Sequence, residues 1–180
     1  MCSGCGCQSI TVIKLLTLQH EEIINKLGQA RRAVERNDLA TAQGFAYELA
    51  NLLNPHSAFE ERGLFAALKL DDEFVEPLEK LILEHKEING LVGRLTEGDI
   101  SVVGYLDTLL RNHISNEENG IFPASVSTID GELWDQIEKD QGYVGLSRAL
   151  AQGFMSGKGH TQAALPAMMH AKIERAPSLN

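Results

Sequence analysis

Residues 56–65 read HSAFEERGLF, and residues 113–122 read HISNEENGIF. The histidine, both glutamates, the glycine and the closing phenylalanine coincide in the two stretches, which indicates an internal repeat. In each stretch a glutamate follows the histidine by four residues: Glu60 follows His56, and Glu117 follows His113. A step of four residues turns a helix by ~400° and advances it by ~6 Å, so each His–Glu pair should occupy one helix face.

The repeat extends to a partner segment that precedes each of these stretches. Residues 18–23 read LQHEEI, and residues 83–88 read LEHKEI. Each partner segment contains one histidine without a following carboxylate at the fourth position, namely His20 and His85. The chain is therefore predicted to consist of two helix pairs, and each pair supplies one lone histidine and one His-x-x-x-Glu motif.

Four apolar stripes with helical spacing run along the chain, and each contains one of these histidines. Residues seven apart share one face of a packed helix. The heptad sets are Ile13, His20, Leu27 and Val34; Leu49, His56, Gly63 and Leu70; Leu78, His85 and Val92; and Leu106, His113 and Gly120. All four histidines are therefore predicted to point into the core.

Helix-stopping residues divide the first half into two long helices. The first is predicted from Ile10 to the Asn-Asp pair at 37–38, and Asp38 is a suitable N-cap for the second. The second is predicted to run through Ala67. Pro55 lies inside it and should kink it, because proline removes a hydrogen bond and clashes with the preceding turn.

The second half is predicted to contain two further long helices and a short one. The third helix opens at 71–72 and ends at 97–99. The fourth is capped by Ser101 and ended by Pro123. A short fifth helix follows around Leu133, Trp134 and Ile137, with Asp130 as its cap.

These elements predict the fold class and the division of the chain. No stretch alternates apolar and polar residues with a strong period of two, so the class is all-α. Four long helices with short connections predict an up-down-up-down four-helix bundle with a short fifth helix and a C-terminal tail. Residues 1–9 form a Cys-rich N-terminal tail, residues 10–142 form the helical domain, and residues 143–180 form a C-terminal extension in which the helical periodicity weakens.

Composition and charge exclude several classes of protein. The chain has 180 residues, 16 Lys and Arg against 25 Asp and Glu, and a net charge of −9. It should therefore repel nucleic-acid phosphates and anionic membrane surfaces. No apolar run approaches the ~20 residues that a membrane helix needs, and the N-terminus lacks the pattern of a secretory signal. We expect a soluble, cytoplasmic protein with no nucleic-acid or membrane partner.

Closing the two helix pairs into a bundle would bring four imidazoles and two carboxylates to its middle. An unpaired carboxylate in an apolar core is very costly, notionally tens of kcal/mol by Born solvation. Two carboxylates in one place are explained if cations hold them. For any single histidine the alternative is a core residue bonded to a backbone carbonyl, but four at matching heptad positions favour metal ligands.

The donor set favours two transition-metal ions. Six such ligands are too many for one tetrahedral zinc, and imidazole is a poor ligand for calcium or magnesium. Each of two ions would take two histidines, while Glu60 and Glu117 bridge the pair and leave open positions for a small ligand. Mixed nitrogen and oxygen ligation with vacancies suits iron, with manganese as a substitute.

The metal-binding residues occur in the order His…His-x-x-x-Glu…His…His-x-x-x-Glu. Each His-x-x-x-Glu stretch contains EE-x-G-[LI]-F, and Phe122-Pro123 closes the last one. Over roughly residues 10–140 this pattern resembles the hemerythrin-like (HHE cation-binding) family. The resemblance implies a non-haem di-iron centre, which is oxo- or hydroxo-bridged when oxidised. It implies bridging by Glu60 and Glu117 and terminal ligation by His20, His56, His85 and His113.

The resemblance implies several functions, and the sequence leaves the choice among them open. Family members bind or sense O2, react with nitric oxide or peroxide in stress responses, or repair iron–sulfur centres. Oxygen carriers of this family have a further histidine four residues after the third-helix ligand, where this chain has Asn89. The chain therefore resembles the sensing, peroxide-reactive and repair branches more closely, and whether it is an enzyme stays open.

The remaining metal-binding side chains lie towards the two ends. Cys2, Cys5 and Cys7 are too few for an all-thiolate site, which takes four, unless another group completes it. They could instead contact a protein client during iron donation to a damaged iron–sulfur centre, or simply form a reduced tail. His160 and His170 lie outside the repeat and are interpreted as surface or packing residues.

Overall fold

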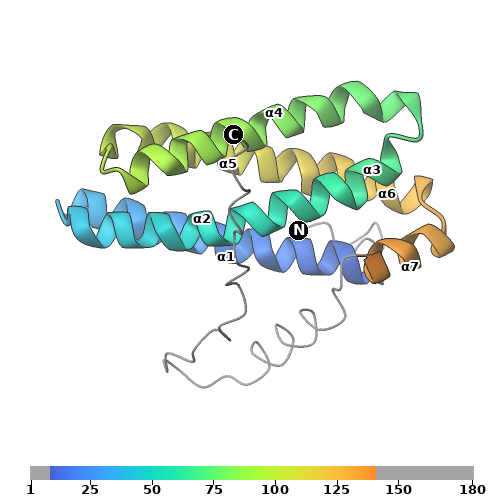
Figure 1. Cartoon of the computed structure of the whole chain (residues 1–180), viewed down its shortest axis with the longest axis horizontal. Helices are drawn as coiled ribbons and strands as arrows, with labels where there is room; N and C mark the ends of the chain where they lie inside the picture. The colour runs from blue at the N-terminus through green and yellow to red at the C-terminus, as the bar shows by residue number, and fades with distance from the viewer. Residues whose placement is uncertain (1–8, 141–180) are drawn as a thin grey trace, which may run out of the picture.

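A computed structural model of the chain describes residues 9–140, and every helix in that range belongs to one bundle (Figure 1). No strand occurs among these residues, in agreement with the predicted all-α class. The α-helices are α1 (Thr11–Glu35), α2 (Leu39–Arg62), α3 (Leu64–Leu68), α4 (Val75–Thr96), α5 (Val103–Asn116), α6 (Phe122–Thr128) and α7 (Gly131–Asp140).

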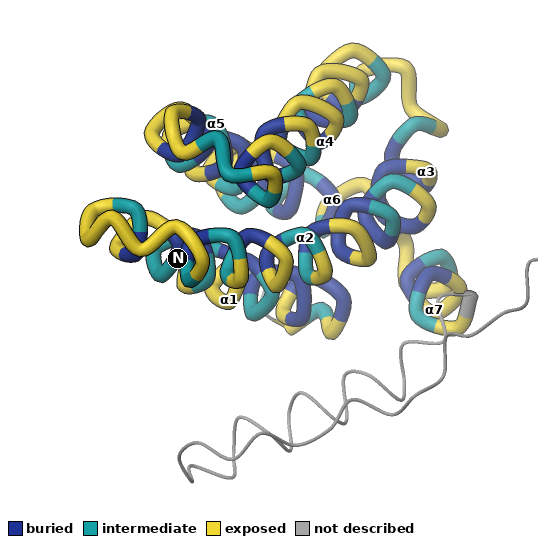
Figure 2. Tube along the Cα trace, turned by 60° about the vertical axis from the view of Figure 1, so that its left-hand side comes forward, coloured by how far each residue is buried: buried dark blue, intermediate teal, exposed yellow. Residues whose placement is uncertain are grey.

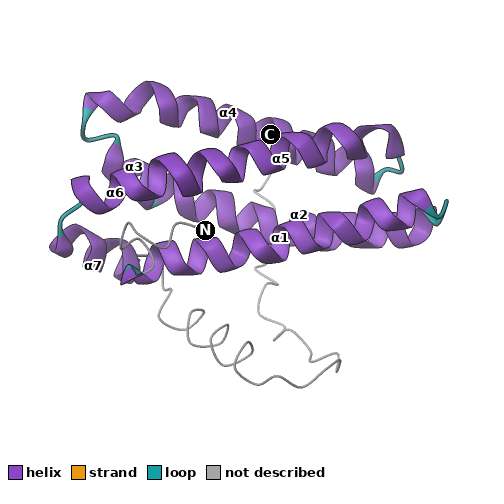
Figure 3. Ribbon diagram, turned by 180° about the vertical axis from the view of Figure 1, so that it is seen from behind, coloured by secondary structure: helices purple, strands orange, loops and turns teal. Residues whose placement is uncertain are grey.

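The four long helices α1, α2, α4 and α5 lie side by side, and consecutive ones run in opposite directions (Figures 1 and 3). Helix α1 packs against α2, α2 against α4, α4 against α5, and α5 against α1. This closed ring of neighbours surrounds a shared interior. Buried residues lie on the sides of the helices that face one another (Figure 2).

The turn between α1 and α2 follows its predicted signals. Asn37 adopts a left-handed conformation with φ of 56°, which asparagine tolerates better than most residues. The Asp38 side chain then accepts a hydrogen bond from the backbone N–H of Thr41 at 3.1 Å and caps α2. These two residues reverse the chain and place His20 and His56 on neighbouring helices.

The prediction for the second helix, which extended it through Ala67, is wrong at the C-terminal end. Helix α2 continues past Pro55 but ends at Arg62. The helix is interrupted at Gly63, and the short helix α3 begins at the next residue. Gly63 has ψ of −88°, outside the helical range. The break takes Leu70 out of the heptad stripe that was extrapolated through Gly63, and Leu70 is 81% exposed.

The start of the fourth helix also differs from the prediction. The N-terminal cap is Asp99, whose carboxylate accepts hydrogen bonds from both the backbone N–H and the hydroxyl of Ser101. A 3₁₀ turn, Ile100–Val102, then leads into α5. Ser101 is thus a donor to the cap rather than the cap itself.

The end of the fourth helix lies beyond Pro123, contrary to the prediction. Helix α5 passes into a π-helical turn, Glu117–Ile121, and continues as α6, with Pro123 in the first turn of α6. Proline is tolerated in the first turn of a helix. The wider π turn also shifts the stripe by one residue, so that Ile121 is buried in place of Gly120.

The last described helix, α7, covers the segment around Leu133, Trp134 and Ile137. The Asp130 carboxylate accepts a hydrogen bond from the backbone N–H of Leu133 at 2.8 Å. Trp134 and Ile137 are buried against the end of the bundle.

The apolar core is divided into two clusters, one towards each end of the bundle. One cluster includes Ile13, Leu16, Phe65, Leu78 and Phe122 together with residues of α7. The other includes Ile23, Leu27, Leu49, Val92 and Leu106. In α1 and α4 the histidine lies between residues of the two clusters, so a polar layer crosses the bundle between two apolar halves.

None of the helices in the described range is both long and apolar enough to cross a membrane. The cysteine tail with Cys2, Cys5 and Cys7 and the C-terminal extension at 143–180 lie outside the described residues, as do His160 and His170.

Candidate metal centre

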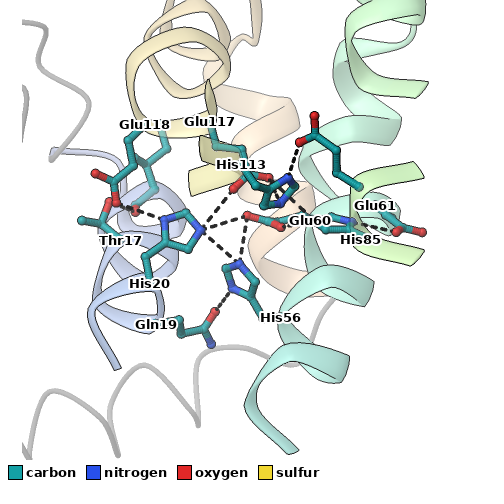
Figure 4. Close-up of polar contacts among 12 residues, drawn as sticks. Thr17, Gln19, His20, His56, Glu60, Glu61, His85, His113, Glu117 and Glu118 are labelled. Atoms are coloured by element: carbon teal, nitrogen blue, oxygen red, sulfur yellow. Dashed lines mark hydrogen bonds and ion pairs between the residues drawn. The ribbon is translucent and has the colours of Figure 1, made fainter. Parts of the chain in front are cut away.

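The structure brings all six predicted side chains together in the polar layer (Figure 4). Each long helix supplies one histidine, α2 also supplies a glutamate, and the π turn after α5 supplies the other. All six residues are buried, with exposed fractions of 0–3%. They are His20, His56, Glu60, His85, His113 and Glu117.

These residues form two overlapping sets of four, which we name position 1 and position 2. Position 1 is formed by His20, His56, Glu60 and Glu117. Position 2 is formed by His85, His113 and the same two glutamates. Within each set one nitrogen or oxygen atom per residue lies within 4.8 Å of all the others, which is close enough to surround one ion.

Glu60 directs its two oxygen atoms to different positions. Its Oε1 lies 3.3 Å from His56 Nε2 and 3.7 Å from His20 Nε2, both of position 1. Its Oε2 lies 3.3 Å from His85 Nε2 of position 2. One carboxylate therefore faces both positions.

Glu117 repeats this arrangement from the opposite side. Its Oε2 lies 3.3 Å from His20 Nε2, and its Oε1 lies 3.2 Å from His113 Nε2 and 3.8 Å from His85 Nε2. Together the two glutamates present one oxygen atom each to position 1 and one each to position 2. This is the geometry that bridging carboxylates require.

Each histidine uses its Nδ1 atom for a hydrogen bond away from the centre, so that Nε2 points inward. His85 and His113 pair with carboxylates of Glu61 and Glu84, each at 2.9 Å. The equivalent contacts of position 1 are His20 with Glu118 at 3.0 Å and His56 with the Gln19 amide oxygen at 2.8 Å. An Nδ1–H that donates to an oxygen leaves the Nε2 lone pair free for a metal.

Two phenylalanines cover the histidines from the apolar side. The Phe122 ring stacks on His20 with centroids 5.7 Å apart, and the Phe65 ring stacks on His85 at 5.9 Å. Phe59 is also buried, 3% exposed. Phe65 and Phe122 therefore contact the centre directly.

Most of the inward-facing nitrogen and oxygen atoms lack hydrogen-bond partners among the described residues, and their spacing suits bound cations. Both oxygens of Glu60, both oxygens of Glu117, and Nε2 of His85 and His113 are buried without a hydrogen-bond partner in the described part of the chain. Such unsatisfied groups are rare and costly in a native core. His20 Nε2 and His56 Nε2 lie 3.1 Å apart, and two nitrogens on one ion at ~2.0–2.1 Å would be separated by roughly 3.0–3.4 Å.

In the metal-free site, the positive charges that a cation would replace are protons on the histidines. Burial alone would lower the pKa of His20, but contacts with Glu117, Glu118 and Glu60 raise it well above its ordinary value. Burial likewise disfavours charged His113, yet Glu117 and Glu84 raise its pKa to about 9. The Glu60 and Glu117 carboxyls have lowered pKa values because the nearby imidazoles outweigh their burial. Protons on imidazoles therefore compensate the two carboxylates when no metal is bound.

We predict that loading the metal-free protein with Zn²⁺ at pH 7 releases protons. The pKa of His113 is about 9, so this imidazole is protonated at pH 7 and must lose its proton before Nε2 can bind metal. Burial lowers the pKa of His56 to about 4, so His56 is already neutral and releases none. Zinc affinity should consequently rise between pH 6 and pH 8. Calorimetric titrations in two buffers of different ionisation enthalpy measure the protons released, and zinc binding that is independent of the buffer would contradict the assignment.

The sequence pattern pointed to the six central residues but not to the side chains that support them. Glu61 and Glu118 support His85 and His20. The role of Gln19 and Glu84 was missed. Their signal was present in the repeat, because each directly precedes a lone histidine at the same position.

Comparison with known proteins agrees with this geometry. The profile of the Hemerythrin HHE cation binding domain matches residues 11–125, which contain all six residues of the centre. No curated protein and no solved structure matches the chain. Because the match covers more than half of the chain and includes both His-x-x-x-Glu motifs, the protein belongs to the hemerythrin HHE cation-binding domain family.

Proposed function

We propose that the protein is a non-haem di-iron protein that binds or reacts with O2, peroxide or nitric oxide in oxidative or nitrosative stress response or sensing. One observation carries the proposal: Glu60 and Glu117 each present one oxygen atom to each histidine pair. Two histidine nitrogens and two carboxylate oxygens at each position suit iron, and they leave part of an octahedral shell free.

Burial of the centre supports a small ligand. The six side chains are at most 3% exposed, and Phe65 and Phe122 stack directly on two of the histidines. A reactant that reaches this layer without unfolding the bundle has to be small and carry little charge. O2, nitric oxide and hydrogen peroxide meet this requirement.

The chain's own groups would provide ligation, orientation and exclusion of water. A bound iron pair would supply electrons for reduction of the small ligand. Glu61, Glu84 and Glu118 would hold three of the imidazoles through their Nδ1–H groups. No side chain is required as a nucleophile, because the six buried polar groups of the centre would all serve as ligands.

The proposal is tested by elemental analysis and a visible spectrum of the purified, oxidised protein. We expect about two iron ions per chain and near-ultraviolet absorption of a bridged diferric pair. Anaerobic reduction followed by stopped-flow mixing with O2, peroxide or nitric oxide then identifies the reactant. Protein that takes up no metal after reconstitution would overturn the proposal and favour a purely structural bundle.

Reversible O2 carriage is disfavoured because Asn89 lies where oxygen carriers have a fifth histidine. A stable, reversible oxygenated form in the same stopped-flow experiment would contradict this. The iron-donating repair function remains an alternative. This function would depend on Cys2, Cys5 and Cys7, which lie outside the described residues. The test is reactivation of a damaged iron–sulfur protein, which should require these cysteines.

A further inference from the structure

The two positions of the centre are related by an approximate internal symmetry. His20 and His56 have ring centroids 4.7 Å apart at 70°, and His85 and His113 have centroids 4.6 Å apart at 66°. The stacking of Phe122 on His20 matches that of Phe65 on His85. The glutamate that follows each bridging residue supports the lone histidine of the other half in the same way.

One supporting contact breaks this symmetry. The Nδ1 atom of His113 pairs with the Glu84 carboxylate, whereas Nδ1 of His56 pairs with the neutral amide of Gln19. The two contacts have nearly equal lengths, 2.9 and 2.8 Å, so they orient the rings equally well. They differ by a full negative charge next to one imidazole.

Other charges near the centre do not compensate this difference. Glu84 is only 15% exposed, and its partner Lys80 is 72% exposed and 3.9 Å away, so Lys80 neutralises it weakly. Glu61, which supports position 2, is more exposed than Glu118, which supports position 1. That difference favours position 1, but Glu61 and Glu118 are both carboxylic acids, and Gln19 alone among the four supports is a neutral amide.

We propose that position 2 binds a divalent metal ion more tightly than position 1, and that Gln19 is the positioning residue that keeps position 1 weak and exchangeable. Because Glu60 and Glu117 serve both positions, the difference has to arise from the histidines and their supports. A carboxylate on Nδ1 makes the imidazole a stronger donor, and losing such support typically costs 10–100-fold in metal affinity. The inference rests on the proposed two-metal centre.

Two bound ions repel each other, so unequal binding steps in the intact protein would not by themselves reveal unequal positions. Single-position variants remove this complication. His56→Ala leaves position 2 intact, and His113→Ala leaves position 1 intact. Protons compete with metal for His113 at pH 7, so the affinities are compared over a pH series and corrected for this competition. We expect the corrected affinity of His56→Ala for one Co²⁺ to be about tenfold or more that of His113→Ala, as measured by competition with a chromophoric chelator.

A second substitution in these variants tests Gln19 directly. Gln19→Glu should tighten Co²⁺ binding about tenfold in the His113→Ala protein, where His56 is present to receive the new charge. In the His56→Ala protein the same substitution has no imidazole to support and should change the affinity little, which makes it a matched control. Co²⁺ absorption bands report whether the ligand geometry is retained.

The nearly isosteric substitutions Gln19→Glu and Glu84→Gln in the otherwise intact chain guard against variants that fail to fold. Gln19→Glu should tighten the weaker of the two Co²⁺ steps, and Glu84→Gln should weaken the tighter one. Glu79→Gln removes an equal charge from an exposed residue of α4 and should alter neither step.

The possible results separate this inference from the proposed function. The inference is wrong if two ions bind but the single-position variants have equal affinities. It is also wrong if neither Gln19→Glu nor Glu84→Gln changes the two Co²⁺ binding steps. In both cases the proposed two-metal centre is unaffected. A protein that binds no metal, or a single ion that His56→Ala and His113→Ala both abolish, overturns the two-metal centre and the inference together.

Discussion

Removal of the metal should lower the melting temperature of the loaded protein by more than about 10 °C. The polar layer separates two apolar clusters, and without metal its two buried carboxylates are compensated only by protons on the neighbouring imidazoles. A ligand that binds only the folded state at a hundred times its dissociation constant adds about 2.7 kcal/mol. Two ions would therefore add roughly 5 kcal/mol, and each kcal/mol corresponds to several degrees in a domain of this size.

The measurement is a pair of thermal unfolding curves, one of the loaded protein and one after exhaustive chelation. The His56→Ala, His113→Ala double variant is the control, because it lacks one histidine at each position. Its melting temperature should lie below that of the loaded protein and should respond much less to the chelator. Equal melting temperatures for the loaded and stripped natural sequence would show that the centre does not hold structural metal.

The bundle and its central residues were predictable because they depend on simple periodicities. A histidine that lies seven residues from buried aliphatic residues on a helix has to enter the core with them, as His20 and His85 do. A glutamate four residues beyond a histidine has to share its face, and Glu60 and Glu117 lie 3.3 and 3.2 Å from the histidines that precede them. Helix geometry alone therefore determines most of the site.

The predictions failed where the helix period changes. The heptad count assumes an uninterrupted helix with seven residues per two turns, but Gly63 interrupts α2 and the chain after Asn116 forms a π turn. Gly63 lies three residues after Glu60, and the π turn begins at Glu117, so both irregularities fall in equivalent parts of the repeat. They exposed Leu70 and replaced Gly120 by Ile121 in the core, and neither change has a signature in residue spacing.

The repeat singles out Gln19 and Glu84, but the partner of each could not be predicted, for a different reason. The supporting contacts join helices, so they depend on the rotation and height of each helix relative to its neighbour. A helix period places Gln19 beside His20 but does not show which residue of α2 it meets. Symmetry of the repeat would have related Gln19 to Glu84 without giving the partner of either.

Glu117→Gln should reduce the metal content from two ions per chain to one. In the natural sequence Oε2 of Glu117 faces His20, and Oε1 faces His113. Glutamine keeps the shape of the side chain but offers one oxygen atom and no charge, so it can serve only one of the two positions. Two divalent ions ~4 Å apart repel by about 16 kcal/mol at an effective dielectric constant of 20, and the negative charge between them offsets this.

Metal analysis after gel filtration, at a free metal concentration that fills both positions of the natural sequence, measures the effect. Glu22→Gln is the matched control, because Glu22 is exposed on α1 and its substitution removes the same charge outside the centre. Peroxide consumption should fall when the second ion is lost. Reduction of peroxide takes two electrons, and a site with one iron lacks the second metal ion that would supply one of them. If Glu117→Gln kept two ions with unchanged affinity, Glu117 would not bridge, and the split of its two oxygen atoms between the histidine pairs would have another cause.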